Sequence, residues 1–303
     1  MDVFVGIDGG GSRATAVATD VEGRELARVE GGPGRIRLDA PGTGAHVLAD
    51  LVDHVIREAG ARLPAAGLIC ALAGAGREDA RRELAAALLR EAVAIRLRVV
   101  TDAEAAYQDA FGGGPGILLI AGTGSIAWGR DADGRTIRAG GWGALLGDEG
   151  SGYDLGLRAL RAVLHAHDGR GPATGLTGTI LGRTGVDSPE GLVTWSARAD
   201  KAEIAALAPC VLEAAEAGDD VASSPVRTAA TDLAAHVDAI HERLAPWPET
   251  PTLAVAGGLL ANGKLLREKT IAAVRAPVRI LDRAVDAARG AAAIARAAWA
   301  PAP

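Results

Sequence analysis

The chain has 303 residues, which is enough for two domains that each bury a core of their own. Its composition, 49% hydrophobic and 23% charged, is that of a globular protein, and a formal net charge of −6 argues against a protein that coats nucleic acid. Cys70 and Cys210 lie far apart and outside any CxxC pair, and no apolar run approaches the ~18 residues of a membrane span, so we expect a cytoplasmic protein without disulfides, metal–cysteine sites or a membrane partner.

The first predicted element is a strand-turn-strand unit. Residues 3–8 form an apolar strand, residues 9–12 a glycine-rich turn, and residues 14–19 a second apolar strand. Glycines allow the backbone N–H groups of such a turn to point at an anion, and hydroxyl groups add donors. The turn therefore either binds a phosphate or merely connects two strands.

Helical and strand patterns then alternate. An apolar residue every fourth position predicts a helix over 44–61, and an Ala/Leu/Arg/Glu segment predicts another over 78–92. Apolar runs predict strands over 66–73 and 95–100, and the second strand delivers Asp102 to its carboxyl end, where open α/β folds bind ligands. Asp102 is a candidate general base, and the alternative is that Thr101 or Asp102 caps the following helix.

Residues 117–129 repeat the first unit as a strand, a Gly-Thr-Gly-Ser turn and a strand. Gly122 and Thr123 lie 111 positions after Gly11 and Ser12, and the two hairpins align without a gap. This duplication indicates two related α/β halves that face each other, each offering a glycine-rich turn to one polyphosphate.

The loop over residues 140–152 is rich in glycine and carries Trp142 and Asp148. An aromatic ring and a carboxylate suit a sugar, because the ring packs on an apolar face and the carboxylate accepts hydrogen bonds from hydroxyl groups. The alternative is a solvated loop anchored by a buried tryptophan.

The remaining chain is mainly helical. We predict helices over 154–165, 201–217 and 227–244, a loop-rich segment over 169–188, and strands over 252–256 and 280–281. His165 and His167 could suggest a metal site, but a helix end explains them better because no further ligand lies nearby in the sequence. A closing helix spans 284–299, with Gly290 where another helix passes close.

Gly258 to Lys264 has the spacing of half a Walker A loop, but Leu265 stands where Ser or Thr would bind Mg²⁺. We therefore reject a Walker A loop. Gly257 and Gly258 at a strand end instead allow a flat ring such as adenine to approach the backbone.

Together these motifs resemble the actin/hexokinase/Hsp70 superfamily of ATP-binding folds, and within it the N-acetylglucosamine kinase and BadF/BadG/BcrA/BcrD ATPase-like group. The resemblance covers nearly the whole chain: 6–12 is similar to the first phosphate motif, 120–125 to the second, 255–259 to the adenosine motif, 101–103 to the catalytic aspartate segment, and 141–151 to the sugar loop of hexosamine kinases. It implies an α/β fold of two ribonuclease H-like domains, of the actin/hexokinase type, with a nucleotide cleft between them. We place the domains at 1–110, to which a closing helix of about 286–299 returns, and at 111–285, which holds the sugar loop and a helical insert.

The resemblance implies ATP-dependent phosphorylation of a hydroxyl group on a small-molecule amino sugar of the glucosamine or N-acetylglucosamine type, with ATP and Mg²⁺ as cofactors. It makes Asp102 the general base and Asp8 the Mg²⁺ ligand. The expected nucleotide contacts are Gly10, Gly11, Ser12, Arg13, Gly122, Thr123, Gly124, Gly257, Gly258 and Ala261. The expected sugar contacts are Arg35, Asp102, Ser125, Gly141, Trp142, Gly143, Ala144 and Asp148. We also expect a homodimer.

One position departs from the family pattern. Kinases of this group commonly have Asn in a Gly-Pro-x-Asn loop, whereas here Gly32-Pro33-Gly34 is followed by Arg35, which cannot accept a hydrogen bond and carries a charge. An unacetylated, modified or acidic amino sugar therefore stays open.

Two other functions stay open. Activator ATPases of the same group hold an iron–sulfur cluster through closely placed cysteines, which Cys70 and Cys210 do not provide. A sugar sensor fused to a DNA-binding module is the other alternative, and no helix-turn-helix pattern precedes Val3.

Overall fold

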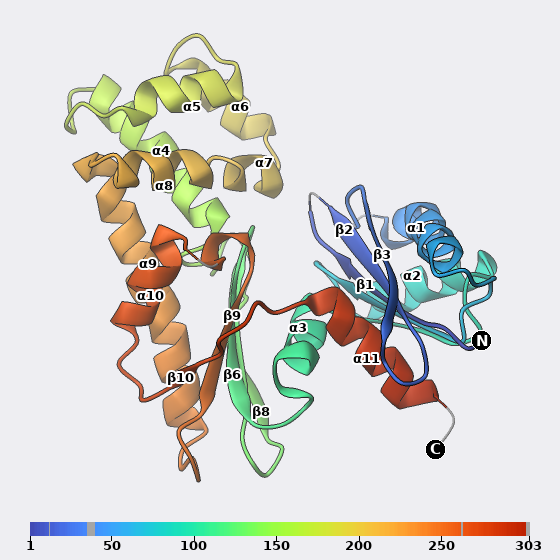
Figure 1. The fold of residues 1–303 in the computed structure, drawn as a ribbon. Coiled ribbons are helices and arrows are strands. Elements are labelled where there is room, and N and C mark those ends of the chain that lie inside the picture. Colours follow the sequence, from blue (N-terminus) through green and yellow to red (C-terminus); the bar gives the residue numbers. More distant parts are fainter. Residues whose placement is uncertain (12, 35–39, 262, 301–303) are drawn as a thin grey trace. The chain divides into compact units, whose positions relative to one another are not determined.

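In this computed structural model, the described residues are 1–11, 13–34, 40–261 and 263–300. The chain divides into two compact units. Unit 1 comprises Met1–Gly113 and Val285–Pro303, and unit 2 comprises Gly114–Ala284. Each unit has its own sheet and its own core (Figure 1).

Unit 1 is built on a five-stranded sheet in the order β3-β2-β1-β4-β5. Its strands are β1 (Phe4–Gly9), β2 (Ala14–Thr19), β3 (Glu25–Gly31), β4 (Gly67–Leu72) and β5 (Leu97–Thr101). The hairpin strands pair antiparallel, whereas β1, β4 and β5 are parallel to one another. The parallel strands therefore end at the same edge of the sheet.

Helices cover both faces of this sheet. They are η1 (Pro41–Gly44), α1 (Ala45–Glu58), α2 (Glu78–Arg90), α3 (Asp102–Phe111) and α11 (Ala287–Trp299). Alternate residues of β1 point to opposite faces, so Val5 and Ile7 pack in the core with α1 and α2, and Phe4 packs with α3 and α11. The last helix of the chain thus completes the core of the first unit (Figure 1).

Two glycines allow α11 to lie against its neighbours. A Cβ on Gly6 of β1 would lie 2.1 Å from the backbone nitrogen of Ala292. A Cβ on Gly290 would lie 2.0 Å from the carbonyl oxygen of Ala105 in α3, so the sequence-based expectation that a helix passes close at Gly290 is confirmed. The backbones of α11, β1 and α3 are in direct contact at these points.

Gly290→Ala tests this packing. Alanine favours a helix over glycine by about 1 kcal/mol, but the new methyl group has no room, so we expect a net loss of about 2 kcal/mol in the free energy of unfolding, measured by urea denaturation. The matched control is Gly182→Ala, because a Cβ at Gly182 meets no neighbouring atom within 4 Å. That change should stabilise the chain by up to about 1 kcal/mol, and the same sign for both variants would contradict the packing described.

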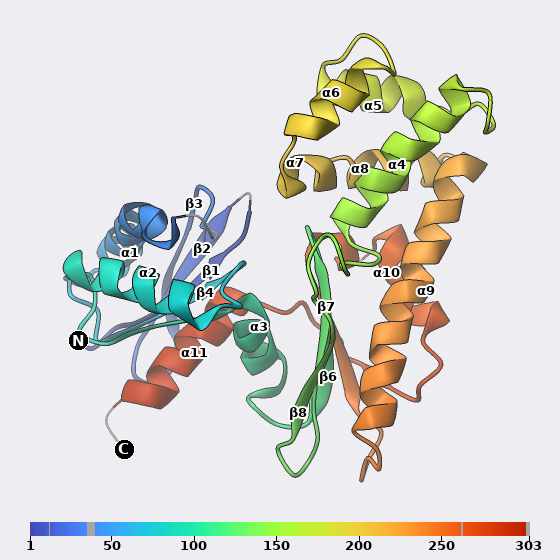
Figure 2. The ribbon, with the colours of Figure 1, turned by 180° about the vertical axis from the view of Figure 1, so that it is seen from behind.

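Unit 2 is built on a sheet in the order β10-β9-β6-β7-β8. Its strands are β6 (Gly116–Ala121), β7 (Ser125–Arg130), β8 (Thr136–Gly140), β9 (Thr252–Ala256) and β10 (Arg279–Ile280). Its helices are α4 (Gly152–His167), α5 (Leu176–Thr184), α6 (Gly191–Arg198), α7 (Lys201–Ala205), α8 (Ala208–Glu216), α9 (Asp220–Arg243), η2 (Gly258–Leu260) and α10 (Leu265–Ala273). The long helix α9 packs against β6, β7 and β8, and helices α4 to α8 gather at one end of this sheet (Figure 2).

The two sheets share one topology. The three-stranded meander β1-β2-β3 corresponds to β6-β7-β8, and the parallel neighbours β4 and β5 correspond to β9 and β10. The duplication that the sequence predicts is therefore present in the folds of the two units, and the predicted α/β class is confirmed.

Two predicted segments were wrong in detail. The helix predicted over 201–217 is divided into α7 and α8, because Pro209 at the start of α8 lacks an N–H group and its ring clashes with a preceding helical turn. The segment predicted to be loop-rich over 169–188 contains α5, whose Leu176 and Ile180 are buried one helical turn apart. His165 and His167 lie in the last turn of α4, as predicted.

Cys70 and Cys210 are both free and buried, and burial raises the pKa of the Cys70 thiol to about 12. Among the described residues, no helix is both long and apolar enough to cross a bilayer.

Candidate functional site

The carboxyl edge of the parallel strands in unit 1 carries two aspartates. Asp8 is the penultimate residue of β1, and Asp102 is the first residue of α3, directly after β5. Thr101 caps α3: its hydroxyl oxygen accepts a hydrogen bond from Glu104 N (3.2 Å), and Glu104 Oε2 accepts one from Thr101 N (3.1 Å). The alternative of a helix cap at Thr101 or Asp102 is therefore confirmed for Thr101. Asp102 follows the cap, and its carboxylate accepts the N–H of Ala103 at 2.9 Å.

Both carboxyl groups are held in surroundings that disfavour their charge. The pKa of Asp8 is raised to about 6, mainly by burial and also by the charges of Asp102 and Asp286, whereas the charge of Arg13 opposes the shift. Burial also raises the pKa of Asp102, and the hydrogen bond from the Ala103 N–H opposes this shift. A carboxylate with a raised pKa is a better proton acceptor, which suits a general base at Asp102.

The chemistry of Asp8 fits a divalent cation. Among the described residues, none donates a hydrogen bond to its carboxylate, although the group is largely buried. A cation would offset both the burial of this charge and its repulsion by Asp102. No described cluster of three or more His, Cys, Asp or Glu side chains could hold a metal, but Mg²⁺ commonly takes only one or two protein carboxylates, together with phosphate oxygens and water.

Because the pKa of Asp8 is raised in the folded protein, the free energy of unfolding should depend on pH. Between 3.8, its ordinary value, and about 6, the unfolded chain loses this proton before the folded chain does, so stability falls as pH rises through that window. Asp8→Asn should therefore raise the free energy of unfolding by up to about 3 kcal/mol at pH 7.5 and by only about 1 kcal/mol at pH 4.5.

Urea unfolding at the two pH values measures this difference. Asp50→Asn serves as the control, because the side chain of Asp50 on α1 is 71% exposed, and it should change the free energy of unfolding by less than about 0.5 kcal/mol at either pH. An Asp8→Asn effect that does not depend on pH would show that burial of the Asp8 charge carries no cost.

The turn after β1 is closed by a hydrogen bond from Gly10 N to Arg13 O at 2.9 Å. Gly11 lies at its tip, and Arg13 is exposed and pairs with Glu30 at 3.7 Å. Ser12 and Arg35, which the sequence places in the nucleotide and sugar sites, lie outside the described residues.

The equivalent turn of unit 2, Gly122–Gly124, is held by its carbonyl groups. The N-terminal turn of α4 donates Gly152 N to Gly122 O at 2.8 Å and Tyr153 N to Thr123 O at 3.3 Å. Among the described residues, none accepts a hydrogen bond from the N–H of Thr123 or Gly124. With its carbonyl groups engaged and two N–H groups available, the turn is suited to bind an anion.

The predicted adenosine motif lies beside this turn. β9 and β6 are parallel, so Gly257 follows β9 at the edge where Gly122 follows β6. A Cβ on Gly257 would lie 2.2 Å from Ala121 O, which explains the need for glycine there, together with its φ of 93°. Gly258 and Ala261 are exposed, and a Cβ on Gly258 meets nothing within 4 Å, so the space above this backbone is open.

The glycine-rich loop after β8 joins the same region. Gly141 N donates to Ser125 O at 3.0 Å, and Ser125 Oγ donates to the carbonyl oxygen of Glu149 at 2.7 Å. Trp142 is 65% exposed, and the guanidinium carbon of Arg138 lies 4.0 Å from the centroid of its ring. The alternative of a buried Trp142 anchor is therefore wrong, because the residue is largely exposed and packs against Arg138.

Asp148 is built into the loop more deeply than the sequence suggested. Its side chain is 5% exposed, its φ is 63°, and both of its oxygens have partners within unit 2. Oδ1 accepts the N–H of Ser125 at 3.1 Å, and Oδ2 accepts the ammonium of Lys201 at 2.6 Å. Lys201 escaped the sequence analysis, since nothing in the local pattern of residue 201 indicates a partner 53 positions earlier in the chain.

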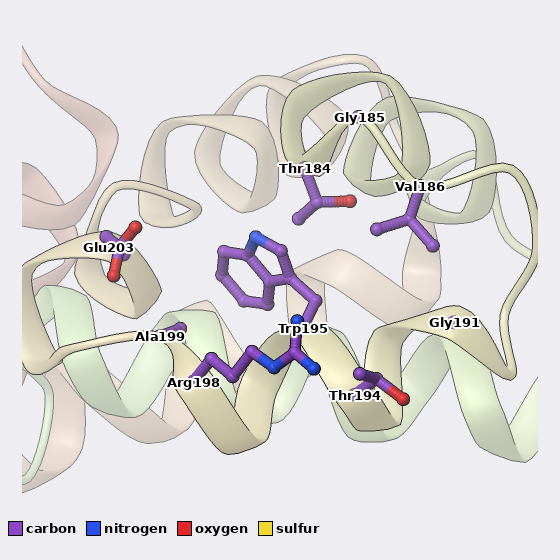
Figure 3. A pocket seen from close by; sticks show the side chains of 9 residues that line it. All are labelled: Thr184, Gly185, Val186, Gly191, Thr194, Trp195, Arg198, Ala199 and Glu203. Atoms are coloured by element: carbon purple, nitrogen blue, oxygen red, sulfur yellow. The ribbon is translucent and has the colours of Figure 1, made fainter.

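A separate pocket of about 360 Å³ lies among α5, α6 and α7. Figure 3 shows the indole of Trp195 lying across it, between Thr184 and Arg198. None of the residues predicted from the sequence to bind nucleotide or sugar lines this pocket, so it is not part of the candidate site.

Two α/β units of one topology, with glycine-rich turns after their first strands, define a two-domain fold of the hexokinase/actin class. The model of the BadF/BadG/BcrA/BcrD ATPase family matches residues 5–295. The chain belongs to this family.

Named relatives extend over almost the entire chain. An N-acetylmuramic acid/N-acetylglucosamine kinase of Clostridium acetobutylicum is 34% identical over 98% of this chain and 99% of its own length. An N-acetyl-D-glucosamine kinase of Dictyostelium discoideum is 30% identical over 97% of this chain and 98% of its own. A crystal structure from Chromobacterium violaceum, provisionally described as an N-acetylglucosamine kinase, aligns with a TM-score of 0.82 at 30% identity over 98% of this chain and 99% of that chain.

Proposed function

We propose that the chain is an ATP-dependent kinase that phosphorylates a hydroxyl group of an amino sugar of the glucosamine or N-acetylglucosamine type. The observation that carries this proposal is the half-buried Asp102 carboxylate, placed at the carboxyl edge of the first sheet with a raised pKa and held by backbone N–H groups at the start of α3. The relatives named as N-acetylglucosamine and N-acetylmuramic acid kinases support the choice of substrate class.

The sugar is bound by the loop of unit 2. The exposed face of Trp142 packs on the apolar face of the sugar ring, and the backbone of Gly141, Gly143 and Ala144 provides polar contacts at its edge. Ser125 and Asp148 form the base of this loop. Arg35 adds a positive charge to the predicted sugar contacts, and we propose that it favours an acidic amino sugar such as N-acetylmuramic acid.

The nucleotide is bound by backbone groups. The N–H groups of Thr123 and Gly124 donate to phosphate oxygens, and the open backbone at Gly258 and Ala261 accepts the adenine ring. Gly10, Gly11, Ser12 and Arg13 supply the phosphate contacts of the first motif, and Gly122 belongs to the second. Gly257 allows the close backbone approach to Ala121 O beside the second motif. Mg²⁺ bound at Asp8 would neutralise charge on the transferring phosphoryl group.

In the reaction, Asp102 accepts a hydrogen bond from the acceptor hydroxyl group of the sugar and takes its proton as the oxygen attacks the terminal phosphorus of ATP. The bond from that phosphorus to the bridging oxygen breaks, and ADP leaves. Tight turns and the free N–H groups of unit 2 hold the phosphates in place while this occurs. We further propose that the protein acts as a homodimer.

Asp102→Asn tests the general base. Asparagine keeps the size of the side chain but cannot take the proton, so we expect sugar phosphorylation to fall by about 10²- to 10⁴-fold. ATP affinity, measured by calorimetry, should stay within twofold of the wild type. Retained turnover would show that Asp102 is not the general base. Asp109→Asn is unsuitable as a control, because the Asp109 carboxylate accepts hydrogen bonds from Arg289 and from the N–H of Asp286. Exposed Asp50→Asn is the matched control and should leave turnover unchanged.

Release of ADP across a panel of sugars tests the function as a whole. Glucosamine, N-acetylglucosamine, N-acetylmuramic acid and glucose are each supplied with Mg²⁺ and ATP. Stimulation by an amino sugar but not by glucose is the expected result. ADP release that no sugar alters would indicate an ATPase that serves a partner protein, and binding of sugar without ADP release would indicate a sensor.

A further inference from the structure

Lys201 is placed at the phosphate turn of unit 2 by a helix far along the chain. A Cβ on Gly124 would lie 3.1 Å from Lys201 Nζ and 2.6 Å from Asp148 Oδ1, so the ion pair lies directly against the turn. Gly124 is one of the two residues of this turn whose N–H has no acceptor among the described residues. A positive charge and an available backbone donor are therefore next to each other.

The ammonium of Lys201 has more N–H donors than hydrogen-bond partners among the described residues. An ammonium group carries three N–H donors, and among the described residues Asp148 Oδ2 at 2.6 Å is its one partner. The Lys201 side chain is 36% exposed, whereas that of Asp148 is 5% exposed. The ammonium thus pairs with a buried carboxylate, while the lysine side chain as a whole is partly exposed.

The position of Lys201 is fixed by packing. Asp200 caps α7, with its carboxylate accepting the N–H groups of Ala202 and Glu203. Further along α7, Ile204 presses on α4, because a Cβ on Gly156 would lie 2.0 Å from Ile204 O. The same helix α4 holds the carbonyl groups of the Gly122–Gly124 turn, so α4 fixes both the turn and the lysine.

A polyphosphate bound at this turn would meet the negative charge of Asp148 close by. Lys201 neutralises that carboxylate, which removes the repulsion, and its remaining donors can reach a phosphate oxygen. We propose that Lys201 is a nucleotide-binding residue, which donates to a phosphate oxygen at the Gly122–Gly124 turn while it stays paired with Asp148. The inference rests on the proposed function, because it requires that this turn binds the phosphates of ATP.

Lys201→Met is the direct test, with binding of ATP, ADP and adenosine compared in the presence of Mg²⁺ by calorimetry and, for adenosine, by ligand-observed NMR titration. Loss of a charge-assisted hydrogen bond should lower the affinity for ATP and for ADP by about 10- to 100-fold. Adenosine has no phosphate, so its affinity should stay within twofold. Lys269→Met, at an exposed lysine of α10, is the matched control and should leave all three affinities unchanged.

The double variant Lys201→Met with Asp148→Asn protects the test against misfolding, because it leaves no unpaired buried charge. The double variant should also bind ATP and ADP more weakly than the wild type while its affinity for adenosine stays unchanged. Unchanged ATP affinity in either folded variant, or equal losses of ATP and adenosine in both folded variants, would overturn the inference and leave the kinase proposal standing. Failure of the wild-type protein to bind ATP would instead overturn the proposed function, and the inference with it.

Discussion

Parallel pairing of strands is the constraint on which the candidate site depends. β1, β4 and β5 run in one direction, so residues 8 and 102, which are far apart in the sequence, lie at the same edge of one sheet. In the other unit, β6 and β9 are parallel, so residues 122 and 257 also lie at one edge of their sheet. In the second sheet the approach is so close that only glycine fits beside Ala121 O. Backbone geometry, rather than any single side chain, therefore determines which residues can act together.

The helical insert of unit 2 adds charge to this backbone frame. Without Lys201 of α7, the Asp148 carboxylate would be buried without a charge partner, and an unpaired buried charge typically costs several kcal/mol. With Lys201 in place, the carboxylate accepts two hydrogen bonds and keeps its loop in a left-handed conformation that a residue other than glycine rarely adopts. The insert therefore supplies the charge partner of a buried carboxylate in the glycine-rich loop.

The sequence was most informative where the pattern repeats or where glycine is required. The duplicated hairpins predicted two units of one topology, and the requirement for glycine at Gly257 and Gly290 is now explained by backbone contacts. The roles of the individual site residues stay predictions, although Ser125, Gly141 and Asp148 do lie together.

The remainder could not be read from local sequence. The pairing of Asp148 with Lys201 depends on a contact across 53 positions, and the exposure of Trp142 depends on how a loop lies on Arg138. The apolar spacing also predicted one helix over 201–217, where the structure has α7 and α8. The spacing of apolar residues does not take account of the missing N–H group of Pro209. Tertiary contacts, which no local pattern contains, decided the first two points, whereas Pro209 is a local signal that apolar spacing does not register.

The buried thiols have a practical consequence. Since Cys70 and Cys210 are 0% and 7% exposed, maleimide and iodoacetamide reagents should leave both unmodified under native conditions. A cysteine introduced at a surface position of each unit could then carry a fluorophore or spin label without removal of native residues. Such a labelled pair would measure directly how the distance between the two units responds to nucleotide and sugar.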